Sequence, residues 1–158
     1  MVAAIIAGAI LRLDPTLGAE HVGSTSVPGC GGKGVIDLAV LYPPEGLARA
    51  RDVVDRLGFQ RQPGPEPFPE SRPMRVGAYQ FAGRVYFVHA HVLEMGCSEH
   101  SELLAFSESL RSSPARRKAY ESNKRSILSS GVTDSAEYAR IKGAFVREVL
   151  EGRISGAK

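Results

Sequence analysis

The spacing of apolar positions divides the first third of this chain into helical and extended segments. Residues 2–13 are rich in Ala, Ile and Leu, and Pro15 ends the pattern because the residue before a proline avoids the helical conformation. Residues 35–42 form a nearly continuous apolar run, which is typical of a strand buried on both faces. Residues 45–57 return to helical spacing. These patterns predict helix, strand, helix, with residues 17–22 left open as a short helix or a strand.

The middle of the chain combines a proline-dense segment with a predicted hairpin. Residues 60–73 contain five prolines, too many for a helix or a strand, and are predicted as a surface loop. The composition of this loop does not distinguish a lid over a site from a tether. Residues 76–81 and 84–93 are rich in β-branched and aromatic residues, and the Ala82-Gly83 pair between them predicts a hairpin turn.

The last third of the chain is predicted to be helical. Ser98 is a suitable N-cap for a helix that ends before Pro114. Two further helices are expected over residues 115–129 and 134–151, the second with an apolar stripe along one face. The helical region therefore follows the strands rather than alternating with them.

This order of elements favours an α+β fold, a small mixed β-sheet with flanking helices and a C-terminal helical segment. A chain of 158 residues suits one domain, and 43% hydrophobic with 23% charged residues is a typical globular composition. We predict a single domain over residues 1–158, with the sheet core at about 17–95 and the C-terminal helices at about 98–152.

Charge and cysteine usage narrow the class of partner. The formal charge of +3 is small and spread along the chain, which permits a phosphorylated small molecule but gives no strong signal for nucleic acid. Cys30 and Cys97 form no CxxC pair and no metal-ligand spacing, and they are interpreted as free thiols in a reducing compartment. The apolar start of the chain is too short to span a bilayer. We expect a cytoplasmic protein without membrane contact, and the oligomeric state is not indicated.

The turn Gly23-Ser24-Thr25 and the acidic residue Asp37 are the first candidates for chemistry. Glycine accepts positive φ and lets backbone N–H groups converge on an anion, to which hydroxyls add donors. The alternative is a tight turn that caps a helix. Asp37 is a lone carboxylate inside an apolar strand, so either it is functional or it is satisfied structurally.

These residues belong to a longer pattern that resembles the GrpB family. The run HVGSTSVPG at residues 21–29 is followed by Lys33, Asp37 and the sequence HAHV at residues 89–92. The resemblance extends from about residue 19 to about residue 150, and its C-terminal part rests on Tyr120, Lys124, Tyr138, Lys142 and Phe145. It implies the nucleotidyltransferase fold, in which a Gly-Ser turn holds the triphosphate and carboxylates on adjacent strands bind Mg²⁺. Similar domains occur fused to dephospho-CoA kinases, which implies a link to coenzyme A metabolism.

The resemblance assigns phosphate binding to Gly23, Ser24 and Thr25, and a catalytic, Mg²⁺-binding role to Asp37. One departure bears on that assignment. Related nucleotidyltransferases place a second acidic residue two positions after the first, where both side chains project from one face of the strand. Here that position is Ala39, and the neighbouring predicted strand offers histidines instead of a third acid.

Histidines form a second group of candidates. His89 and His91 are two residues apart on a predicted strand, so they share a face and can contact a phosphate or substrate, with His91 the stronger candidate. The alternative is one buried, satisfied histidine and one at the sheet margin. His21 precedes the glycine turn and either joins them or packs at the end of its strand.

Lysines and tyrosines form the third group. Lys33 either holds a phosphate or is a solvated loop residue. Tyr120 with Lys124, and Tyr138 with Lys142, are each four residues apart and so share a helix face. That repeated face either closes over the phosphates of a ligand or packs its tyrosines in the core with its lysines directed to water.

Two functions from different classes follow. The first is a Mg²⁺-dependent nucleotidyltransferase that uses Asp37 and an unknown acceptor. The second is a non-catalytic module that binds a nucleotide or another phosphorylated metabolite through Gly23, Ser24, Lys33 and His91. The missing carboxylates favour the non-catalytic binding module, whereas the fold that the resemblance implies favours the nucleotidyltransferase.

Overall fold

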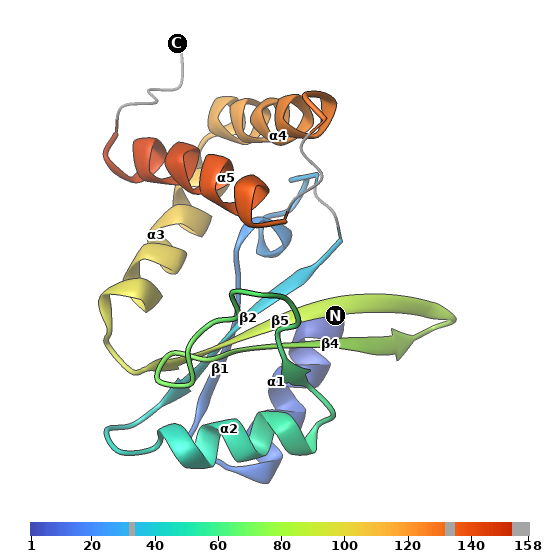
Figure 1. Ribbon diagram of the computed structural model, residues 1–158, viewed down its shortest axis with the longest axis vertical. Helices are drawn as coiled ribbons and strands as arrows, with labels where there is room; N and C mark the ends of the chain where they lie inside the picture. Colours follow the sequence, from blue (N-terminus) through green and yellow to red (C-terminus); the bar gives the residue numbers. More distant parts are fainter. Residues whose placement is uncertain (32–33, 132–134, 153–158) are drawn as a thin grey trace.

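The computed structural model describes residues 1–31, 34–131 and 135–152, and it contains a five-stranded mixed sheet flanked by helices (Figure 1). The strands are β1 (Gly18–Val22), β2 (Ile36–Tyr42), β3 (Gln60–Arg61), β4 (Met74–Phe81) and β5 (Arg84–Glu94). Their order across the sheet is β1-β2-β5-β4-β3. Strand β2 runs parallel to β5, and the other three pairings are antiparallel.

The helices divide into two groups. Helices α1 (Val2–Leu13) and α2 (Leu47–Arg56) precede the hairpin, and α3 (Ser98–Ser112), α4 (Pro114–Ser129) and α5 (Ser135–Leu150) follow it. Figure 1 shows α4 and α5 together at the opposite end of the molecule from α2. The arrangement confirms the α+β fold class, with a mixed sheet, flanking helices and a C-terminal helical segment. None of the described helices is long and apolar enough to cross a membrane.

Apolar residues cover both faces of the sheet, but unequally. The face toward α1 and α2 carries the main core, in which Leu38, Val40 and Val88 are fully buried against helix residues such as Ile6 and Val54. Burial of this many aliphatic side chains is the main source of stability of the fold. The opposite face has a smaller apolar cluster under α3, and its other positions carry both polar and apolar side chains.

The conformations of residues 17–22, of the hairpin and of the proline-rich segment can now be compared with their predictions. The segment predicted at 17–22 as helix or strand is a strand, β1. In the hairpin turn, Ala82 and Gly83 both have positive φ, 49° and 75°, as a type I′ turn requires. The predicted loop at 60–73 needs correction at its start, because Gln60 and Arg61 pair with β4 as the short strand β3.

The predicted cap of α3 was wrong by one residue. Cys97, with extended backbone, is the N-cap, and Ser98 is already helical. The chain leaves β5 through Gly96 at φ 78°, and this turn sets the first helical residue earlier than the preference of serine suggests. Pro114 does end α3, but it is also the first residue of α4, where a missing N–H costs nothing.

Candidate functional site

Strand register decides which candidates face one another. Asp37 on β2 is in register with His89 on β5, and the next inward row joins Ala39 to His91. Because side chains alternate along a strand, Asp37, His89 and His91 lie on one face, the face toward α3. His21 is in register with Leu38 and therefore lies on the other face, toward α1. The structure thus brings three of the four candidates together and separates His21 from them.

Asp37 is the centre of this polar group. Its Oδ1 atom lies 3.5 Å from His89 Nδ1 and 3.9 Å from His91 Nε2, and the side chain is 23% exposed. Burial acts to raise the pKa of Asp37. Hydrogen-bonding contacts with the two histidines and the charges of His91 and Lys142 outweigh burial and hold that pKa well below its usual range. Asp37 is therefore an anion at neutral pH, surrounded by donors.

The turn beside Asp37 requires glycine for two reasons. Gly23 has φ 71°, and a Cβ atom on it would lie 2.8 Å from Asp37 Oδ2. The Gly23 N–H donates to Ser107 Oγ on α3 at 3.0 Å, and the Ser26 hydroxyl donates to the Gly23 carbonyl at 2.7 Å. The amide of Gly23 is thus occupied by protein. In the described part of the chain, the N–H groups of Ser24 and Thr25 have no such partner.

Ser107 is a site residue that sequence reasoning missed. It is separated from Gly23 by 84 residues, and its hydroxyl donates to the Leu103 carbonyl at 2.8 Å, one turn earlier in the same helix. A serine in the middle of an amphipathic helix carries no signal that distinguishes this role from ordinary bonding to its own backbone.

Tyr120 and Lys124 reach the turn from α4. Tyr120 is almost fully buried and packs edge-on against Phe106, with ring centroids 5.2 Å apart. Burial raises the pKa of Tyr120, while hydrogen bonding by Ser24 opposes the rise. Its hydroxyl is therefore protonated and next to the turn. Lys124 lies over the Tyr120 ring, 4.3 Å from its centroid, and its buried amine donates to the Gly31 carbonyl.

A second residue of α4, Glu121, also binds the backbone of Gly31. The Gly31 N–H donates to Glu121 Oε1 at 2.6 Å, so Glu121 and Lys124 bind the two polar backbone groups of one glycine. Burial lowers the pKa of Lys124, and the charge of Lys142 acts in the same direction. The tyrosine thus packs in the core as one interpretation expected, but Lys124 is buried rather than directed to water.

Lys142 on α5 completes the group. Its side chain is half-buried, and its charge acts on both Asp37 and Lys124, so it lies within electrostatic range of both. Tyr138 is on the same helix, but its side chain lies outside the described residues, as does the whole of Lys33. The predicted roles of Tyr138 and Lys33 therefore stay predictions.

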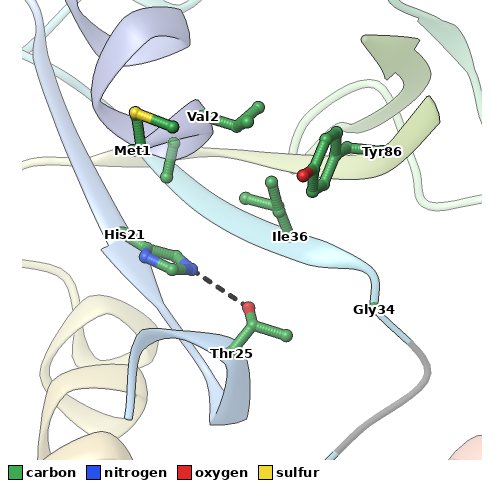
Figure 2. A pocket seen from close by; sticks show the side chains of 8 residues that line it. Met1, Val2, His21, Thr25, Gly34, Ile36 and Tyr86 are labelled. Atoms are coloured by element: carbon green, nitrogen blue, oxygen red, sulfur yellow. Dashed lines mark hydrogen bonds between the residues drawn. The ribbon is translucent and has the colours of Figure 1, made fainter. Parts of the chain in front are cut away.

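His21 and the Thr25 hydroxyl face a separate cavity of about 300 Å³, shown in Figure 2. His21 Nε2 lies 3.0 Å from Thr25 Oγ1, and Met1, Val2 and Tyr86 lie around them. Burial lowers the pKa of His21. The Thr25 side chain is thus engaged on the α1 side, so only its backbone N–H remains directed to the turn.

The proline-rich segment reaches the candidate site through Phe68. Its ring packs edge-on against His91, with centroids 6.1 Å apart, and Arg72 lies over the Phe68 ring, 4.8 Å from its centroid. Arg72 also pairs with Glu99 on α3 at 2.6 Å, and Glu70 accepts two hydrogen bonds from Arg75, at 3.0 Å and 2.9 Å. These contacts hold the segment against β4, β5 and α3.

The donor set does not fit a two-magnesium centre. Ala39, where a second carboxylate would stand, is fully buried in an apolar cluster with Leu41 and Leu93, against which Leu103 of α3 packs. Within residues 1–31, 34–131 and 135–152, no three His, Cys, Asp or Glu side chains gather in a way that could hold a metal ion. Mg²⁺ prefers oxygen ligands, whereas the neighbours of Asp37 are imidazoles.

Comparison with known sequences identifies the family. The family model described as GrpB protein matches residues 2–152. The chain is 33% identical over 141 residues to the UPF0157 protein PA4798 of Pseudomonas aeruginosa, covering 86% of this chain and 55% of that protein. It is also 33% identical over 141 residues to the UPF0157 protein SCO7215 of Streptomyces coelicolor, covering 83% and 68%. The chain thus spans little more than half the length of the first relative.

Solved structures place the fold. The crystal structure of conserved protein GrpB from Enterococcus faecalis has a TM-score of 0.70 at 20% identity, covering 96% of this chain and 92% of that one. A cytoplasmic RNA terminal U-transferase gives 0.56 at 11% identity, covering 84% and 39%, and the GLD-2/RNP-8 complex gives 0.58 at 15%, covering 92% and 47%. The fold matches that of nucleotidyltransferase structures, and the chain belongs to the GrpB family.

Proposed function

We propose that this chain binds a phosphorylated ligand, with nucleotides the leading class, between Asp37 and the C-terminal helices, without two-metal nucleotidyl transfer. One observation carries the proposal. A single ionised carboxylate lies 3.5 Å and 3.9 Å from two imidazoles and within the electrostatic range of Lys142, while the position of a second carboxylate is filled by Ala39 under apolar packing. Such a group offers donors and positive charge to an anion but lacks the oxygen ligands of a paired metal site.

The surrounding groups support an anion in particular. Ser24 and Thr25 present backbone N–H groups without protein partners among the described residues, and Tyr120 adds a protonated hydroxyl. The role we assign to Asp37 is to orient His89 and His91 and to hold Lys142 nearby. Charge-assisted hydrogen bonds from such donors to phosphate oxygens are among the stronger polar contacts in proteins.

A second candidate function is nucleotidyl transfer with one Mg²⁺ shared between Asp37 and the phosphates of the ligand. The ionised state of Asp37, its contact distance to Gly23 and the nucleotidyltransferase fold favour this candidate. Mg²⁺ keeps several waters and takes ligands from substrate phosphates, so one carboxylate is the minimum that this candidate needs.

A binding panel separates the two candidates. Isothermal titration of the wild type with ATP, UTP, coenzyme A and tripolyphosphate, each with and without Mg²⁺, should give binding that does not need the metal. Coenzyme A belongs in the panel because the family resemblance links similar domains to its synthesis. Lys142→Met should weaken binding about tenfold, as loss of a charged hydrogen bond would. Lys118→Met, at an exposed position of α4, is the matched control.

Each outcome has a clear meaning. Binding that needs Mg²⁺, disappears in Asp37→Asn and is accompanied by release of pyrophosphate would establish the second candidate. Equal loss of affinity in Lys142→Met and Lys118→Met would show that only net charge matters, which contradicts the proposed site. Failure of every ligand to bind the wild type would reject both candidates.

A further inference from the structure

The exposed end of β5 continues the face that carries Asp37 and His89. Phe87 precedes His89 by two residues, so both side chains leave the strand on the same face, about 7 Å apart. Phe87 is 60% exposed, and Val85, two residues further along, is 59% exposed. Two large apolar side chains thus extend the candidate site toward the tip of the β4–β5 hairpin, which projects beyond the helices in Figure 1.

The neighbouring strands leave the Phe87 ring uncovered. On β4, the residue in register with Phe87 is Ala78, which is small and exposed. On the other side, the pairing of β2 with β5 begins at Ile36 and Val88, so among the described residues Phe87 has no strand partner there. An aromatic ring with one open face, next to a cluster of charged groups, needs an explanation because water is a poor neighbour for it.

We propose that Phe87 is the stacking surface for the base of a nucleotide ligand. This rests on the proposed function, in which Lys142 and His89 bind the phosphates. A nucleotide is charged at its phosphate end and planar and aromatic at its base. This face of the sheet has a matching arrangement, with hydrogen-bond donors around Asp37 and the Phe87 ring two residues along β5 from His89. The ligand class is therefore a nucleoside phosphate rather than inorganic phosphate or an aliphatic phosphate ester.

This arrangement also sets the selectivity that we expect. Every base has a planar face, so stacking on a phenyl ring tolerates all of them, whereas selectivity requires hydrogen bonds to the base edges. Ala78, in register with Phe87, and Val85, two residues before it, offer no side-chain donors or acceptors, and the nearest amide on β4, that of Gln80, is in register with Val85, one row further from Asp37. ATP, GTP and UTP should consequently bind with similar affinity.

The first test is Phe87→Ala, titrated with ATP and with tripolyphosphate. Loss of stacking should weaken ATP binding about tenfold and leave tripolyphosphate binding unchanged. Leu11→Ala is the control, because Leu11 is also exposed but lies on α1, on the other side of the sheet. Thermal melting checks the fold of each variant, and an exposed side chain at position 87 makes unfolding unexpected.

The second test is Phe87→Trp, which introduces one fluorophore into a chain that has no tryptophan. ATP should quench its emission with the same affinity that titration gives, whereas tripolyphosphate should not, and Leu11→Trp should respond to neither. Equal quenching by the two ligands, or an unchanged ratio of their affinities in Phe87→Ala, would overturn the stacking role and leave the phosphate site intact. If neither ligand binds the wild type, the proposed function fails and the stacking role fails with it.

Discussion

The two faces of the sheet use the same strands for opposite purposes. On β2 and β5, Leu38, Val40 and Val88 face α1 and α2 and are fully buried, while Asp37 and His89 face the other way and are partly exposed. Because side chains alternate at every residue, a shift of one residue exchanges the core for the site. Burial of the core face therefore fixes where Asp37 and His89 lie on the opposite face.

The largest expected effect comes from breaking the core face. Leu38→Ala removes a fully buried side chain and should lower the free energy of unfolding by about 3 kcal/mol, from lost burial and the cavity left behind. Leu128→Ala, at a position that is 49% exposed, should change it by less than about 0.5 kcal/mol. Urea denaturation measures both. A small effect at Leu38 would mean that the main core lies elsewhere.

The contact between Gly23 and Asp37 should give the next largest effect. Gly23→Ala adds a Cβ atom 2.8 Å from Asp37 Oδ2 in a left-handed backbone conformation, and should cost about 2 kcal/mol. In an Asp37→Ala background the 2.8 Å contact is removed and only the 3.3 Å contact with the Cβ of residue 37 remains, so the same substitution should cost only about 1 kcal/mol, mostly the backbone penalty. A double-mutant cycle measures the difference, and additivity would contradict the close approach.

Loss of the link from α3 should have a smaller effect. Ser107→Ala leaves the buried Gly23 N–H without its acceptor and should destabilise the protein by about 1.5 kcal/mol. Ser101→Ala, at an exposed position on the same helix, should be nearly neutral. Chemical denaturation compares the two variants, and equal effects would show that Ser107 does not support the turn.

The smallest effect depends on pH. Because the folded-state pKa of Asp37 is lowered, its charge stabilises the protein fully above the unfolded pKa of about 3.8, and this contribution is lost progressively as the pH falls from that value toward the lower pKa of the folded state. Asp37→Asn should therefore be less stable than wild type at pH 7, by about 1 kcal/mol for a partly exposed group, with the gap shrinking toward pH 3. Asp52→Asn, an exposed control on α2 that pairs with Arg56 at 3.7 Å, should change the stability at pH 7 by less than about 0.5 kcal/mol. A constant gap for Asp37→Asn would contradict its ionised pairing.

Local sequence predicted the parts of this molecule that depend on local physics. The period of two along β5 placed His89 and His91 on one face, and the turn chemistry of Ala82 and Gly83 gave the hairpin. Contacts between segments that are distant in the sequence could not be predicted from local patterns. Ser107 and Phe68 reach the site from a helix and a loop whose positions are fixed only by tertiary packing.

Ala39 stands at the position where related nucleotidyltransferases have a second acidic residue. The sequence shows only that this carboxylate is missing. In the structure it is fully buried in an apolar cluster, with Leu103 packed against that cluster. A carboxylate at this position would be a buried charge without a partner among the cluster, at a cost of several kcal/mol. The apolar packing of the sheet at this position therefore disfavours a second acidic residue.

Glu121 and Lys124 hold the N–H and the carbonyl of Gly31, which belong to successive peptide units and follow a fixed order along the chain. Two side chains in a salt bridge can exchange places and keep their attraction, but an acceptor cannot replace the donor at a carbonyl, nor the reverse at an N–H. The pair therefore reads the orientation of the backbone as well as its position. A backbone that ran through this position in the opposite direction would place an N–H against Lys124 and a carbonyl against Glu121, so α4 selects one backbone direction at Gly31.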